Sequence, residues 1–156
     1  MPDADATNHA LRIDTALLDR PVQIADLVVA RPGACGAECV FLGRTRAERH
    51  PEHGDLEALQ YDAYRPMAER VLRTIGEEVG DRTGASSIVV RHSVGRVAVG
   101  EASVGIAVLA GHRAEAFGAC RAVIDRVKAE APIWKRELWT GGASWQAGAP
   151  AQAGAE

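Results

Sequence analysis

The sequence predicts a single-domain α+β fold in which a mostly antiparallel sheet packs with three helices. Three observations support this prediction. Strand-like segments alternate irregularly with three helical patterns, two pairs of strand segments lie close enough to form hairpins, and 156 residues suffice for one hydrophobic core. A parallel doubly wound sheet would instead require a regular alternation of strand and helix.

The first part of the chain predicts three strands, one helix and a long loop. Residues 11–13 suit a short strand, and residues 21–30 have helical spacing of apolar side chains with a proline at the start. Residues 35–43 and 56–64 are rich in small, β-branched or alternating apolar side chains, which favours strands. Residues 44–55 are charged and contain proline and glycine, so we expect a mobile loop there.

The second part of the chain has clear periodicity, with helices that start or stop at proline. The predicted elements are a helix at 66–79, strands at 87–92, 96–99 and 102–110, the longest helix at 113–130, and an extended segment at 133–139. The two strands before residue 100 flank a tight connection. The predicted apolar helix faces are Met67, Val71, Leu72, Ile75 and Val79, and Phe117, Cys120, Ile124, Val127 and Ala131.

These elements form one domain over residues 10–145, without a linker or an internal repeat. Residues 1–9 are acidic and polar, and residues 146–156 consist mainly of alanine, glycine, proline and glutamine. Such compositions cannot build a core, so we expect both segments to be flexible tails.

Composition narrows the function classes. The chain is 47% hydrophobic and 25% charged with a net charge of -3, which argues against general nucleic-acid binding. No run of apolar residues is long enough to span a membrane, and the N-terminus is unlike a signal peptide. Three cysteines without a Cys-x-x-Cys pair favour reduced thiols and a cytoplasmic protein. No nicotinamide, ATP or serine-hydrolase motif is present, so we expect no cofactor.

Lysine is scarce in a chain that otherwise uses arginine. Of 18 basic residues only two are lysines, Lys128 and Lys135, seven positions apart around a helix end. Arginine stays protonated, whereas a buried or crowded lysine can lose its proton and act as an acid, base or nucleophile. Two amines in one pocket would lower the pKa of one of them. Two surface lysines with no function remain the alternative.

Other cations recur beside these lysines. Arg44 and Arg46 follow a predicted strand, His112 and Arg113 stand where a strand leads into a helix, and Arg136 follows Lys135. Guanidinium groups and helix N-termini both bind anions, so convergence of these segments would make one cationic pocket for a small anionic substrate. If these segments do not converge, each cationic side chain could equally be a solvated surface charge.

Metal and redox sites have weaker support. His50 and His53 are spaced as a ligand pair could be, but further ligands and a helical context are missing, so we expect no metal. Cys35 and Cys39 suit a strand in the core better than a redox pair. Cys120 falls on the apolar face of the long helix, which favours a core position.

Several segments together resemble the catalytic large subunit of molybdopterin synthase. The segments are 92–97 (HSVGRV), 99–104 (VGEASV), 112–117 (HRAEAF), 124–137 (IDRVKAEAPIWKRE), Phe41-x-Gly43-x-x-Arg46 and Tyr61-x-x-Tyr64. They occur in the family's order over residues 10–145, and the element around the two lysines is highly specific.

The resemblance implies an α/β hammerhead fold and a sulfur-transfer reaction. Members of this family convert cyclic pyranopterin monophosphate into molybdopterin, using a thiocarboxylate on the C-terminal Gly-Gly of a small ubiquitin-like partner. Two large subunits form a homodimer that carries two small subunits, which makes a heterotetramer. By the same resemblance, Lys128 and Lys135 are catalytic, and Arg46, His112 and Arg113 bind the substrate anion. Whether Arg46 and His112 come from one protomer or from two is left open by the sequence.

The resemblance has one departure that bears on the site. Many members of the family continue after the arginine matched by Arg46 with an Asn/His stretch, whereas this chain has Ala47-Glu48-Arg49-His50. Two other functions remain as alternatives. One is a non-catalytic module that binds a ubiquitin-like tail or a phosphorylated metabolite, and the other is a structural homodimer without a ligand.

Overall fold

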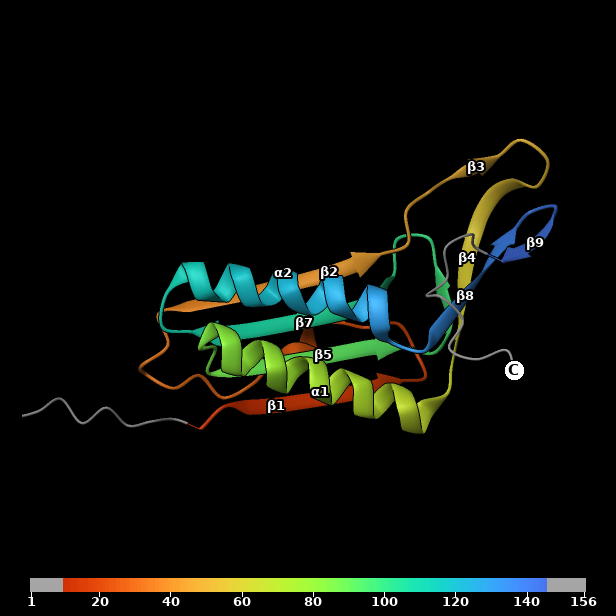
Figure 1. The fold of residues 1–156 in the computed structure, drawn as a ribbon. Helices are drawn as coiled ribbons and strands as arrows, with labels where there is room; N and C mark the ends of the chain where they lie inside the picture. The colour runs from red at the N-terminus through yellow and green to blue at the C-terminus, as the bar shows by residue number, and fades with distance from the viewer. Residues whose placement is uncertain (1–9, 146–156) are drawn as a thin grey trace, which may run out of the picture.

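The computed structural model describes residues 10–145 as two sheets and two α-helices (Figure 1). The predicted tails at 1–9 and 146–156 lie outside the described residues. The elements in chain order are β1 (Arg12–Leu18), the short 3-10 helix η1 (Ile24–Leu27), β2 (Ala37–Arg44), β3 (Arg49–His50), β4 (Gly54–Ala63), α1 (Arg65–Thr83), β5 (Ser87–Ser93), β6 (Gly95–Ala98), β7 (Ala102–Ala110), α2 (Arg113–Glu130), β8 (Ile133–Trp139) and β9 (Gly142–Trp145).

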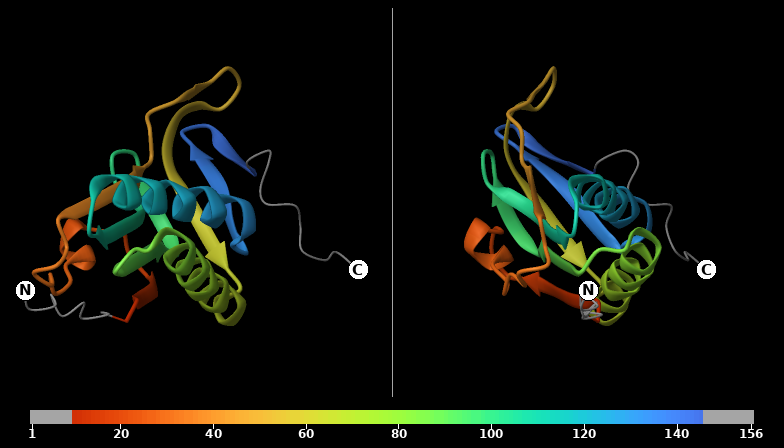
Figure 2. Two further views of the ribbon diagram at one scale, coloured as in Figure 1. Left: turned by 60° about the vertical axis from the view of Figure 1, so that its left-hand side comes forward. Right: turned by 90° about the vertical axis from the view of Figure 1, so that its left-hand side faces the viewer.

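The first sheet has the strand order β1-β5-β7-β2. Only β1 and β5 run parallel, while β7 pairs antiparallel with both β5 and β2. Helices α1 and α2 lie side by side over one face of this sheet (Figure 2). The main core fills the space between the two helices and this sheet, with Ile88, Val90 and Ile106 fully buried on the sheet side.

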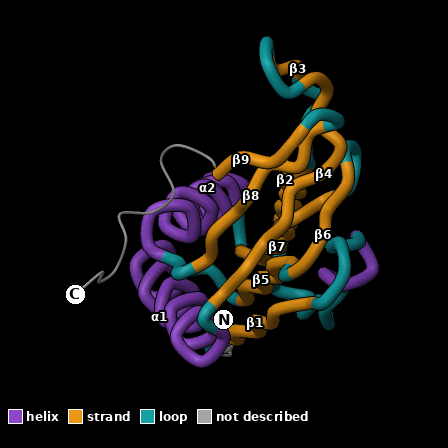
Figure 3. The backbone as a smooth tube through the Cα atoms, turned by 90° about the vertical axis from the view of Figure 1, so that its right-hand side faces the viewer, coloured by secondary structure: helices purple, strands orange, loops and turns teal. Residues whose placement is uncertain are grey.

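The second sheet has the order β3-β4-β8-β9, with β6 added to β4. It stands at the end of the first sheet, beyond the C-terminal end of α2 (Figures 1 and 3). The predicted tight connection after His92 does not join a hairpin, because β5 pairs in the first sheet and β6 in the second. The predicted α+β class and mostly antiparallel pairing are confirmed.

The predicted number of helices is wrong, because residues 10–145 form two α-helices and not three. Within residues 21–30 only η1 is helical, and Val22 instead donates its backbone N–H to Ala102 O at 2.9 Å. That bridge holds the segment against the sheet. Leu27 is then buried, whereas Ile24 and Val28 remain largely exposed, so their helical spacing does not reflect a buried helix face.

Helix α1 starts within one residue of its predicted start, but it ends at Thr83, four residues after the predicted end at Val79. Pro66 stands in its first turn, and Gly84 ends it in the left-handed conformation with its N–H bonded to Gly80 O at 2.9 Å. Gly80 also lets the helix approach the sheet closely, because a Cβ there would lie 2.4 Å from a side-chain carbon of Leu11. At 19 residues α1 is one residue longer than α2, so the prediction that α2 is the longest helix is wrong.

Both predicted helix faces are wrong at one large residue. Met67 and Phe117 were expected in the core, but the buried stripes pass through Ala68 and Ala116, and Phe117 is 67% exposed. Small alanines can pack against the sheet at the shortest helix–sheet distance, which turns the bulkier neighbour to the margin.

The predicted loop at 44–55 contains a short hairpin instead of a continuous loop. Arg49 and His50 of β3 pair with Asp55 and Gly54 of β4. The imidazole rings of His50 and His53 stack at 4.5 Å between centroids, and His50 also contacts Trp139 at 5.3 Å. These contacts tie the hairpin to β8. No helix among residues 10–145 is long and apolar enough to cross a membrane.

Candidate active site

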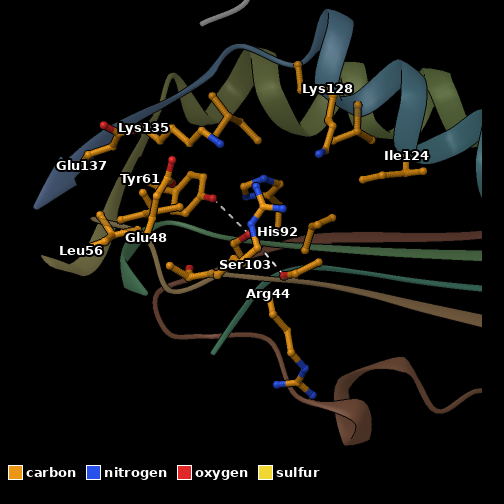
Figure 4. A pocket seen from close by; sticks show the side chains of 18 residues that line it. Arg44, Glu48, Leu56, Tyr61, His92, Ser103, Ile124, Lys128, Lys135 and Glu137 are labelled. Atoms are coloured by element: carbon orange, nitrogen blue, oxygen red, sulfur yellow. Dashed lines mark hydrogen bonds between the residues drawn. The ribbon is translucent and has the colours of Figure 1, made fainter. Parts of the chain in front are cut away.

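A cavity of about 600 Å³ opens where the two sheets meet under the C-terminal end of α2 (Figure 4). The ends of β2, β5 and β7 form one wall, and β4 and β8 form the other. Residues of the last two turns of α2 close the top. A volume of this size suits a small organic ligand.

Both lysines of the chain enter this cavity. Lys128 extends from the last turn of α2, and Lys135 extends from β8 on the other side of the helix break (Figure 4). Pro132 ends α2, so the chain turns back and β8 pairs with β4. Alternation along β8 then directs Lys135 and Glu137 to the cavity.

The electrostatics of the cavity affect Lys135 most directly. Burial lowers its pKa from the ordinary value, and the positive charge of Lys128 lowers it further. The carboxylates of Glu137 and Glu48 act in the opposite direction and offset part of this shift. The predicted lowering of one amine's pKa is therefore confirmed in direction, although burial contributes more than the second lysine.

Three polar side chains lie at the floor of the cavity: Tyr61, His92 and Ser103 (Figure 4). The Tyr61 hydroxyl donates to Ser103 Oγ at 3.1 Å, and its ring contacts the imidazole of His92 edge-on at 5.2 Å. Burial raises the pKa of Tyr61, so this phenol stays protonated under neutral conditions. Burial lowers the pKa of His92 to about 4, which leaves the ring uncharged.

The predicted arginines take different positions. Arg46 lines the cavity at its open side. Arg44 contributes to the lining, but its guanidinium donates to Gly100 O at 2.9 Å and points away from the lysines (Figure 4). Arg136 is exposed and lies between two cavity residues on β8, so strand alternation places it on the opposite face.

The anion site predicted at His112 and Arg113 lies at the other end of α2. Both side chains are exposed and border a shallow depression with Gly36 and Glu115. Arg113 and Lys128 are 15 residues apart on one helix, which separates them by about 22 Å. Within one chain the structure therefore brings the two lysines together with Arg46 but does not bring His112 and Arg113 to them.

Cysteine and metal predictions concern the rest of the domain. Cys120 is buried in the core, as predicted, and burial together with the neighbouring Cys39 raises its thiol pKa to about 12. Cys39 packs against the same core from β2. Among residues 10–145, no three His, Cys, Asp or Glu side chains come close enough together to hold a metal ion.

Sequence reasoning assigned no role to His92, Tyr61 or Ser103. For His92 a signal was present, because Ile88, Val90 and His92 occupy alternate positions of one strand and so share its core face. A histidine that continues an apolar face is a candidate for a buried polar site. Ser103 and Tyr61 are 42 residues apart and lie on different strands, so no local pattern could have paired them.

Comparison with known proteins identifies related sequences and structures. The model of the MoaE protein family matches residues 17–130. The molybdopterin synthase catalytic subunit 1 of Mycobacterium tuberculosis is 37% identical over 130 residues, covering 83% of this chain and 87% of that protein. The molybdopterin synthase catalytic subunit of Halalkalibacterium halodurans is 36% identical over 132 residues, covering 83% of each.

Solved structures show the same fold. The crystal structure of molybdopterin synthase from Staphylococcus aureus superposes with a TM-score of 0.75 at 32% identity, covering 84% of this chain and 95% of that one. A complex of subunits 1 and 2 of the molybdopterin-converting factor from Helicobacter pylori gives 0.60 at 25% identity, covering 72% of each. The fold, the matched length and the identity over most of the chain show that this protein belongs to the MoaE family, whose relatives are molybdopterin synthase catalytic subunits.

Proposed function

We propose that this chain is the catalytic subunit of a molybdopterin synthase and acts in molybdenum cofactor biosynthesis. It would transfer sulfur from the C-terminal thiocarboxylate of a small ubiquitin-like subunit to cyclic pyranopterin monophosphate, which forms the dithiolene of molybdopterin. The observation that carries the proposal is the pair Lys128 and Lys135 in one cavity, in a member of this family. The family's α/β hammerhead architecture is part of the same proposal.

In the proposed reaction, the thiocarboxylate sulfur forms a C–S bond to a side-chain carbon of the pterin and displaces an oxygen substituent of that carbon. The two lysines stabilise the developing anions and transfer a proton to the leaving oxygen. Lys135 suits proton transfer because its pKa is lowered, so its neutral form is more accessible than that of an ordinary lysine. Its position also suits holding the acyl group of the partner's tail. Water then cleaves the acyl–sulfur bond, which leaves the sulfur on the pterin and frees the carrier as a carboxylate, and a second carrier delivers the second sulfur.

Binding of the substrate phosphate is proposed for Arg46, His112 and Arg113. Arg46 lies at the cavity that holds the lysines, whereas His112 and Arg113 lie about 22 Å along α2. A homodimer that places the α2 N-terminus of one protomer at the cavity of the other would unite them. The geometry gives no support for Arg44 or Arg136 as substrate ligands, because neither guanidinium points into the cavity.

The partner subunit follows from the relatives. The Helicobacter pylori structure contains subunits 1 and 2 of its converting factor together. We infer that this chain likewise binds a small sulfur-carrier subunit, with a homodimer at the centre of a heterotetramer. We place the reaction in the cytoplasm, which the three free cysteine thiols support.

The direct test is conversion of cyclic pyranopterin monophosphate by this protein mixed with a thiocarboxylated small subunit from the same cell. Dithiolene product is expected with the thiocarboxylated carrier and absent with the same carrier ending in an ordinary carboxylate. If the small subunit binds but no product forms, the chain is a binding module and not the catalytic subunit.

A further inference from the structure

His92 is a buried titratable side chain that lines the cavity, with 8% of its surface exposed. It stands near the end of β5 and continues the core face of Ile88 and Val90. Its ring reaches the cavity floor below the two lysine amines (Figure 4). The proposed mechanism uses the lysines and leaves this residue without a role.

One hydrogen bond determines the tautomer of the ring. His92 Nδ1 lies 2.8 Å from the carbonyl oxygen of Ser93. A carbonyl oxygen only accepts, so Nδ1 carries the proton, and Nε2 of the neutral ring presents a lone pair. Among residues 10–145, no donor is bonded to Nε2, and this atom is not among the side-chain atoms sealed from solvent. Nε2 therefore keeps accessible surface, and the ring that carries it lines the cavity.

The ring remains uncharged while it faces the cavity. Burial lowers the pKa of His92 to about 4, the hydrogen bond to Ser93 offsets part of that shift, and the charge of Lys135 adds to it. The other titratable or charged groups on the cavity wall are Arg44, Arg46, Glu48, Tyr61, Lys128, Lys135 and Glu137. At pH 7 a group with this pKa is protonated only about one time in a thousand, so it is too weak a base for efficient proton transfer.

The neighbouring hydroxyls are already engaged. Tyr61 donates to Ser103 Oγ, and Ser103 Oγ lies 3.5 Å from Gly43 O, which can accept its proton. His92 Nε2 thus offers an uncharged acceptor at the floor, in a cavity whose lysines and Arg46 offer donors for anions. Nε2 has no partner among residues 10–145, so a donor group of a bound ligand can pair with it.

We infer that His92 is a substrate-recognition residue whose Nε2 accepts a hydrogen bond from an N–H or O–H group of the bound pterin. This inference rests on the proposed function, since it concerns the same cavity. The lysines and Arg46 would recognise the charge of the substrate, and His92 would recognise a neutral donor. A compound that presents only an anion, such as inorganic phosphate, would not engage it.

Two substitutions separate the roles of the two ring nitrogens. The amide of His92→Asn can replace the Nδ1 donor to Ser93 O but places no atom at Nε2. The amide of His92→Gln reaches the Nε2 position and offers an oxygen acceptor there. We expect H92N to raise KM for the pterin by about tenfold to a hundredfold with a smaller change in kcat, and H92Q to stay within a few-fold of wild type.

Thermal unfolding of both variants checks that the fold is kept. Equal losses in H92N and H92Q would indicate a structural role and overturn the inference, as would an unchanged KM in H92N. Wild-type protein that makes no dithiolene would overturn the proposed function, and the inference with it. If the wild-type protein makes dithiolene and H92N keeps the wild-type KM, the inference is overturned but the proposed function is not.

A measurement on the wild-type protein covers the case in which the variants do not fold. Nitrogen NMR of the imidazole should show the Nδ1–H tautomer and a shift of the Nε2 resonance when cyclic pyranopterin monophosphate saturates the protein. Inorganic phosphate should leave that resonance in place. An Nε2 resonance that stays unchanged when the pterin saturates the protein would contradict the inference.

Discussion

The two ends of helix α2 differ in what surrounds their cationic groups. At the C-terminal end, two sheets enclose Lys128 and Lys135 in a cavity, and burial lowers the pKa of Lys135. At the N-terminal end, His112 and Arg113 are exposed beside a shallow depression. The enclosed end can change the protonation chemistry of its residues, whereas the open end can supply charge and hydrogen bonds to something that docks there.

The largest effect is expected from Lys135→Arg at the enclosed end. The guanidinium keeps the positive charge but cannot release its proton, so kcat should fall by about a hundredfold or more while substrate binding is largely kept. Steady-state kinetics of dithiolene formation measures both quantities. Arg136→Lys is the matched control, since it exchanges the same two residue types on the opposite face of β8 and should leave turnover unchanged. Turnover near wild type in K135R would remove Lys135 from the mechanism.

Lys128→Ala should weaken both binding and rate, by roughly tenfold each, because its amine serves the substrate and also lowers the pKa of Lys135. Without that charge the pKa of Lys135 rises toward its ordinary value. The limb of the pH–rate profile that reports neutral Lys135 should therefore move to higher pH. Arg121→Ala removes one positive charge from the exposed face of α2 and should leave the profile in place. An unmoved profile in K128A would show that the two amines act independently.

The open end should affect binding more than chemistry. We expect His112→Ala to raise KM about tenfold, because an exposed helix N-terminus with its histidine contributes to anion binding. If that end completes the cavity of the other protomer, hybrid dimers of H112A and K135R contain one intact site. Co-expressed in equal amounts and assayed at substrate concentrations far below KM, where H112A alone keeps about a tenth of wild-type activity, the two variants should then recover about a quarter of wild-type activity.

Hybrids of K135R and K128A are the control for this mixing experiment. Both lysines belong to the cavity of one chain, so no hybrid has an intact site and activity should stay low. Failure of H112A and K135R to recover activity, with hybrids present, would place His112 outside the partner's site.

Acid should destabilise the enclosed end through His92. Its pKa is about 4 in the folded protein and near 6.5 when unfolded, so the unfolded chain takes up the proton first as the pH falls. The stability contribution is complete above pH 6.5 and is lost as the pH falls to 4, by at most about 3 kcal/mol. Denaturant unfolding across this range should show the loss in wild type and a weaker dependence in His92→Gln. Parallel profiles for the two proteins would assign the acid sensitivity to other groups.

The smallest effect is expected from packing at the open end. Phe117 is 67% exposed near the start of α2, so Phe117→Ala should change the free energy of unfolding of the monomer by less than about 0.5 kcal/mol. Val127 is 4% exposed at the enclosed end, and Val127→Ala should cost about 2 kcal/mol. Urea denaturation of both variants measures the contrast. A large loss in F117A would mean that this end of the helix is covered by protein.

Local sequence determined most of the elements. Pro66 and Gly84 bound α1, Pro132 ends α2, and the apolar run at 102–110 forms β7 over that whole range. These signals work because backbone geometry at proline and glycine, and the periodicity of apolar side chains, depend on a few neighbouring residues. The same local reasoning, with the family resemblance, selected the two lysines that share the cavity.

Tertiary structure decided what local patterns leave open. A backbone bridge between Val22 and Ala102 forms where the sequence predicted a helix. In α1 and α2, alanines such as Ala68 and Ala116 form part of the buried face, while their larger neighbours lie at its margin. It also brought His92, Tyr61 and Ser103 to one floor of the cavity. The physical reason is that burial, and the pKa shifts it causes, depend on segments far apart in the chain, whose pairing no short stretch of sequence contains.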